Sequence, residues 1–131
     1  MKKALLLFNL LLSIKLLLSQ NTIGLPQIIN YTNTDFHAGT QTWDIKQDKW
    51  GRMYFANNEG LITFDGNYWK IYPQPNKTIL RSIAIDSIDN RIYAGGQDEI
   101  GFFAPNLNGI LQYTSLKNLI PKPHYQFTDI W

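Results

Sequence analysis

Two histidines and no cysteine limit the metal and nucleophile chemistry of this chain. A zinc site needs three or four converging His, Cys, Asp or Glu ligands. His37 and His124 lie beside turn-forming or proline-rich sequence, and neither has a partner at ligand spacing. Without cysteine there is no thiolate nucleophile, no disulfide framework and no lipobox-type lipid anchor. The sequence therefore predicts no metal site and no cofactor.

The aspartates come next, because a pair of carboxylates can act as acid and base in hydrolysis. A short carboxylate in a turn bonds nearby backbone N–H groups, which is a sufficient structural reason for its place. Asp98-Glu99 is similar to a calcium loop only superficially, because it lacks further oxygen ligands at fixed positions. We predict no catalytic residue and no enzymatic activity. The aspartates judged structural fall at turns or outward strand positions: Asp44, Asp48, Asp65, Asp86 and Asp89.

Aromatic side chains are the remaining candidates, with four Trp and seven Tyr in the chain. Those spread along apolar runs are expected to pack in the core, where large rings bury the most surface. Trp50 instead lies in the turn 48–51, so we expect it to be exposed. It is the one candidate for ligand contact, as a platform for a sugar ring or another small molecule. The rings assigned mainly to the core are Trp43, Tyr54, Tyr68, Trp69, Tyr72, Tyr93 and Tyr113.

The composition is that of a folded chain rather than a disordered one. Of 131 residues, 14% are aromatic and only 17% are charged, against about 25% charged in an average protein. Three of the 12 basic residues (Lys2, Lys3 and Lys15) lie in the segment 1–19, which leaves nine against ten acidic ones. A remainder of net charge −1 offers no electrostatic footprint for nucleic acid or an anionic membrane.

The segment 1–19 has the pattern of a signal peptide. Lys2 and Lys3 form a basic start, an apolar run covers 4–18, and Ser19 is a small residue suited to cleavage before Gln20. The run is shorter than the roughly 20 residues of a spanning helix, although an uncleaved anchor remains the alternative. Both interpretations predict export to the periplasm or the medium, with membrane contact only through this leader. A lead-in segment, 20–40, follows.

An internal repeat organises the rest of the chain. Arg52-Met53-Tyr54-Phe55-Ala56 recurs as Arg91-Ile92-Tyr93-Ala94-Gly95, at an offset of 39. Upstream and downstream the best matches shift to offsets of 40 (Trp43 with Ile83) and 41 (Tyr72 with Tyr113). A period of this length is typical of propeller blades, which take roughly 40 residues each.

Each repeat unit contains four short apolar runs separated by turn residues. In the first unit the runs are 42–47, 53–56, 61–64 and 68–72, and the separators hold Gly, Asn and Asp, which tight hairpins favour. Within the first run, Trp43 and Ile45 are expected on the buried face, with Asp44 and Lys46 opposite. No stretch sustains a helical period; the best helix candidate, 114–119, is short and ends against Pro121.

These patterns predict an all-β chain, a partial β-propeller of about two four-stranded antiparallel blades. The blades are assigned to 41–74 and 78–114, a loop to 115–126, and the first strand of a third blade to 127–131. A β-sandwich is the alternative, although a sandwich does not require one four-strand pattern twice at a near-constant period.

Several strings resemble the two-component regulator propellers of Bacteroidetes-type bacteria. They are 41–48 (QTWDIKQD), 51–61 (GRMYFANNEGL), 64–69 (FDGNYW), 78–83 (TILRSI) and 99–103 (EIGFF). The resemblance covers roughly 24–131. It implies the N-terminal part of a periplasmic sensor whose further parts are a complete propeller, a triple-tyrosine domain, a membrane span and a histidine kinase or helix-turn-helix output.

The leading hypothesis for function is thus a non-catalytic, ligand-sensing part of a signal-transduction regulator, present as a fragment. Its partners are an extracellular carbohydrate or small molecule and the missing remainder of the propeller. The alternative is part of a secreted, propeller-type carbohydrate-active enzyme or binding protein. A third hypothesis is a fragment without independent function, because open propellers leave faces and edges uncovered.

Overall fold

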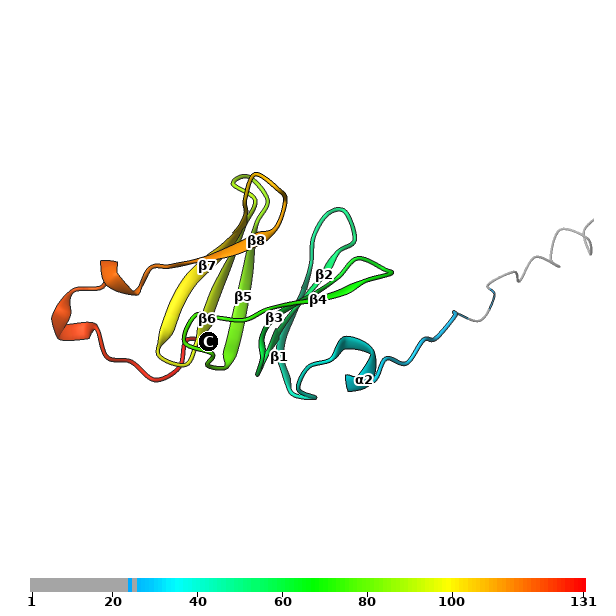
Figure 1. The fold of residues 1–131 in the computed structure, drawn as a ribbon, viewed down its shortest axis with the longest axis horizontal. Helices are drawn as coiled ribbons and strands as arrows, with labels where there is room; N and C mark the ends of the chain where they lie inside the picture. Colours follow the sequence, from blue (N-terminus) through cyan, green and yellow to red (C-terminus); the bar gives the residue numbers. More distant parts are fainter. Residues whose placement is uncertain (1–23, 25) are drawn as a thin grey trace, which may run out of the picture. The chain divides into compact units, whose positions relative to one another are not determined.

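The computed structural model describes residues 24 and 26–131. The chain divides into two units, Met1–Asn30 and Tyr31–Trp131. Every helix and strand described below belongs to the second unit (Figure 1). The predicted signal peptide lies outside the described residues. Among the described residues, none of the helices could span a membrane.

The second unit contains two antiparallel sheets of four strands, each joined in simple chain order (Figure 1). The all-β fold with two four-stranded antiparallel units is thereby confirmed. Sheet A comprises β1 (Thr42–Gln47), β2 (Met53–Asn57), β3 (Gly60–Phe64) and β4 (Trp69–Tyr72). Sheet B comprises β5 (Leu80–Asp86), β6 (Arg91–Gly96), β7 (Glu99–Pro105) and β8 (Leu111–Ser115).

Helical structure in the described residues is confined to three single turns. They are α2 (Asn33–Phe36) before sheet A, and the 3-10 helices η1 (Lys117–Leu119) and η2 (Lys122–His124) after sheet B. The strand predicted at 127–131 is present only as one isolated antiparallel bridge between Gln97 and Asp129. No second strand in the described part of the chain extends that bridge into a ladder.

The first strand of each sheet carries an irregularity that the sequence did not reveal. The register shifts between Thr42 and Asp44 in β1 and between Leu80 and Ser82 in β5. A bulge of this kind reverses which face the following residues take. Trp43 packs against the core as expected, but the expected alternation is wrong for the residues that follow it. Ile45 is 51% exposed, and Asp44 instead accepts a hydrogen bond across the gap from the backbone N–H of Ile83 (3.0 Å).

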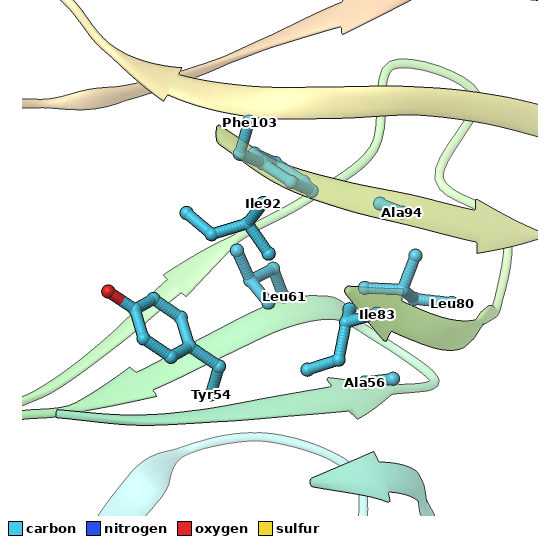
Figure 2. Packing of buried hydrophobic residues seen from close by; sticks show 8 residues of the cluster. All are labelled: Tyr54, Ala56, Leu61, Leu80, Ile83, Ile92, Ala94 and Phe103. Atoms are coloured by element: carbon cyan, nitrogen blue, oxygen red, sulfur yellow. The ribbon is translucent and has the colours of Figure 1, made fainter. Parts of the chain in front are cut away.

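The core lies between the two sheets. Figure 2 shows its eight side chains meeting from strands of both sheets. β5 is the strand of sheet B that lies closest to sheet A, since it approaches both β1 and β2. The core side chains are Tyr54, Ala56 and Leu61 from sheet A and Leu80, Ile83, Ile92, Ala94 and Phe103 from sheet B.

Unlike faces of the repeat meet in this core. Ala94 and Phe103 point from sheet B toward sheet A. Their counterparts at the offset of 39 are Phe55 and Phe64, which contact the ring of Trp69 on the opposite face of sheet A. Equivalent residues of the two sheets therefore face the same direction. The face of sheet B that carries Ala94 and Phe103 packs on the face of sheet A opposite to the one that carries Phe55 and Phe64, an arrangement we call front-to-back packing.

The outer face of sheet A is covered by an aromatic cluster. Trp69 stacks on Phe64 (centroids 4.2 Å apart) and meets Tyr31 edge-on (5.2 Å) and Phe36 (5.4 Å). The lead-in segment thus packs on the sheet through Tyr31 and α2. Trp69, which was expected between the sheets, belongs to this outer cluster instead.

Candidate ligand-binding cleft

One end of the two sheets forms a cleft of about 460 Å³, which we call the turn-end cleft. It is bordered by residues of the β1–β2 and β3–β4 turns of sheet A and of the β5–β6 and β7–β8 turns of sheet B. This volume is within the range of small-molecule sites. Its charged and aromatic lining residues include Asp48, Trp50, Arg52, Asp65, Asp86 and Arg91.

Trp50 stands on the rim of this cleft and is 69% exposed, as its place in a turn predicted. The Lys49 ammonium lies over its ring, 4.4 Å from the centroid. Trp50 is not the sole exposed aromatic residue, because Trp131 and Tyr68 (70%) are exposed as well. Of these three, Trp50 alone lines the turn-end cleft.

Asp48 fixes the turn that carries Trp50. Its Oδ1 accepts hydrogen bonds from the backbone N–H groups of Trp50 and Arg52, both at 2.9 Å. Its Oδ2 accepts a hydrogen bond from the Tyr54 hydroxyl at 3.0 Å. Burial and the neighbouring Asp48 carboxylate raise the pKa of Tyr54 above its ordinary value. Both oxygens of Asp48 thus have structural partners, as expected of a turn aspartate.

Asp65 and Asp86 play the same part in two other turns. Asp65 Oδ1 accepts hydrogen bonds from the N–H groups of Asn67 (3.0 Å) and Tyr68 (2.8 Å). These bonds lower the pKa of Asp65, with Tyr68 contributing most. Asp86 Oδ1 accepts from Ile88 (2.9 Å). In both carboxylates the bonds to the turn use Oδ1, so Oδ2 is the oxygen that can accept from a ligand.

The two arginines of the cleft differ in how they are held. Arg91 lies over the ring of Phe102 (4.7 Å to the centroid) and 3.8 Å from the Asp89 carboxylate. Arg52 forms no salt bridge with any described residue. The cleft that Trp50 lines therefore also offers a guanidinium whose donors are not taken by a described carboxylate.

The described residues include no group of three His, Cys, Asp or Glu side chains close enough to hold a metal ion. His37 caps the C-terminal end of α2, and His124 is the last residue of η2. Glu99 begins β7 rather than lying in a turn. Its Oε1 accepts hydrogen bonds from Ser115 (2.7 Å) and Tyr113 (3.2 Å). Burial and the Glu99 charge raise the pKa of Tyr113.

A second polar cluster involves the bulged positions of the first strands. The Arg81 guanidinium lies 3.9 Å from the ring centroid of Trp43 and 5.2 Å from that of Trp131. Arg81 Nε also donates to Asp129 Oδ1 at 3.1 Å. No sequence pattern signals this cluster, because its members lie far apart along the chain and meet only through the fold.

Comparison of the chain with models of known protein families, with curated proteins and with solved structures found no match in any of the three.

Proposed function

We propose that the two sheets are consecutive blades of a β-propeller and that the chain is the N-terminal part of an exported, ligand-sensing module of a signal-transduction regulator. The module binds an extracellular carbohydrate or small molecule in the turn-end cleft and does not transform it. Binding energy comes from Trp50 at the rim and from polar groups in the cleft wall.

The packing of unlike faces supports the propeller. Two sheets related by a sandwich-type two-fold bring equivalent faces together, whereas here front meets back. Front-to-back packing can be repeated from unit to unit, as blades around an axis require. The close approach of β5 to sheet A also agrees with blades that converge on their first strands.

The single observation that carries the ligand-binding proposal is the place of Trp50. An indole exposed by 69% borders a cleft whose walls hold both hydrogen-bond donors and acceptors. Concave sites that combine an aromatic surface with a few polar groups are the usual form of small-molecule sites. The aspartates of the cleft each bond turn backbone through Oδ1, and Oδ2 of Asp48 also accepts from Tyr54. We therefore assign them to the turns and to hydrogen bonds with the ligand rather than to hydrolysis.

The test is calorimetric titration of the chain with a panel of oligosaccharides, alongside a reducing-sugar release assay. We expect binding without product. Trp50→Ala should weaken binding about fivefold or more, on the scale of the about 1–3 kcal/mol that an aromatic side chain contributes when a nucleic-acid base stacks on it. Tyr68→Ala is the matched control, because Tyr68 is equally exposed but does not line the cleft.

Sugar release that depends on the chain would contradict a sensing role and favour the enzyme alternative. Equal affinities of the parent chain and Trp50→Ala would remove the turn-end cleft as the site. A larger effect of Tyr68→Ala than of Trp50→Ala would place binding on the β3–β4 turn instead.

A further inference from the structure

Three fully apolar side chains protrude from the turns of sheet B beside the turn-end cleft. Ile88 lies in the β5–β6 turn and is 92% exposed, and Leu107 and Ile110 lie in the β7–β8 turn and are also exposed. Ser87 and Gly109, their neighbours in the chain, line the cleft. We call Ile88, Leu107 and Ile110 the apolar rim.

No described residue covers the apolar rim, and the turns do not need apolar residues there. Asp86 and Asn106 set the two turns by accepting backbone N–H bonds (2.9 Å to Ile88, 2.9 Å to Asn108). The side chains at the tips contribute nothing to those bonds. Single exposed apolar residues are common, but these three lie on two turns of one sheet whose other residues line a single cleft, and apolar groups exposed beside a polar site are a feature of binding surfaces.

We propose that the ligand of the turn-end cleft is an amphiphile, with a polar head in the cleft and a hydrocarbon chain on the apolar rim. This inference rests on the proposed ligand-binding function and specifies its ligand class. The head bonds to the guanidinium of Arg52 and to Asp65 and Asp86 Oδ2, while its ring lies on Trp50. The hydrocarbon of the amphiphile then covers Ile88 and Leu107, which a purely polar ligand would leave in water.

A single amphiphile fits these features better than a rigid protein surface or an intact bilayer. A protein partner would have to fill a hollow of about 460 Å³ beside the apolar rim, and interfaces need close packing at their centre. Insertion into a bilayer would draw Asp86 and Asp89, which flank Ile88, toward the hydrocarbon, and buried carboxylates are costly there.

The experiment compares octyl and methyl glycosides of glucose, galactose and maltose, titrated into the full chain below the critical micelle concentration. Each pair shares one head and differs only in the hydrocarbon. We expect the octyl member of a bound pair to bind about 100-fold more tightly, if about half of the seven added methylenes are covered. The double variant Ile88→Ser/Leu107→Ser should bind the octyl glycoside at least tenfold more weakly than the parent chain does and bind the methyl glycoside with unchanged affinity. Leu119→Ser, at an exposed position in η1, is the matched control.

The apolar leader is common to all variants, so only differences between variants are assigned to the apolar rim. Equal affinity for octyl and methyl glycosides would overturn the amphiphile and leave the proposed function standing. If the double variant Ile88→Ser/Leu107→Ser keeps the full difference in affinity between octyl and methyl glycosides, the apolar rim is not the site of the hydrocarbon. Binding to phosphatidylcholine vesicles but not to monomeric octyl glycosides would overturn the single amphiphile as the ligand and favour insertion into a bilayer. Failure of all octyl and methyl glycosides, together with failure of the oligosaccharide panel, would overturn both proposals.

Discussion

Replacing Asp44 with alanine tests how the two sheets are held together. Asp44 Oδ2 accepts the backbone N–H of Ile83 across the gap between sheets (3.0 Å), and Oδ1 accepts from Ile45 N–H (2.8 Å) and Lys46 Nζ (2.7 Å). Ile83 is buried, so the variant leaves a buried donor without a partner. A donor stranded in this way costs about 1–3 kcal/mol.

We therefore expect Asp44→Ala to lower the free energy of unfolding by about 2 kcal/mol. For a domain of this size that corresponds to a fall in Tm of about 8–16 °C. Asp44→Asn keeps one carbonyl oxygen for Ile83 and should lose about half as much. Lys46→Ala is the control for the exposed ion pair, which contributes about 0–1 kcal/mol.

The assay is urea unfolding followed by tryptophan fluorescence and far-UV circular dichroism, with the midpoint compared at constant slope. Burial raises the pKa of Asp44, but the bonds from Lys46, Ile83 and Ile45 outweigh it and lower the pKa below 3.8. The carboxylate's contribution is thus fully present above pH 3.8 and is lost as the pH falls through the lower folded value. Asp44→Ala costing no more than Lys46→Ala would refute the inter-sheet role, as would a difference that persists unchanged in acid.

Three further predictions concern packing. Gly101→Ala places a Cβ against the carbonyl oxygen of Thr114 and should cost about 1–3 kcal/mol in urea unfolding; a neutral result would mean that β7 and β8 are farther apart. Trp69→Ala empties the outer aromatic cluster and should cost about 2–3 kcal/mol, somewhat less than a fully buried ring, with loss of near-UV dichroism; retention of that signal would contradict the cluster. Arg81→Ala removes the partner of Asp129, so amide exchange in 128–130 should accelerate about tenfold or more; unchanged exchange would show that Arg81 does not hold this segment.

The strands were predictable from the sequence because their signals are local. Turn residues such as Asp65 and Gly66 lie directly between the apolar runs, and Asp-Gly chemistry limits where a hairpin can turn. The same local logic placed Trp50 in a turn and so predicted its exposure. The turn roles of Asp48 and Asp86 also followed from spacing alone, and the structure confirms them.

What the sequence did not reveal depends on contacts between distant segments. The bulge at Trp43 reverses the faces of Asp44 and Ile45, and no residue pattern near it announces the change. The outer cluster joins Tyr31, before the first strand, to Trp69 in the last strand of sheet A. The turn-end cleft exists only where turns of two sheets come together, so Arg52 became a candidate only once sheet B was placed.

The most direct test of ligand binding in the turn-end cleft is fluorine NMR of the chain labelled with 5-fluorotryptophan, titrated with the ligand that binds best. The four tryptophans give four signals, which Trp→Phe variants assign. We predict that the Trp50 signal shifts with ligand concentration while those of Trp43, Trp69 and Trp131 stay in place. A shift of Trp43 and Trp131 with an unmoved Trp50 would contradict this site, because the ligand would then lie beside Arg81 and not in the turn-end cleft.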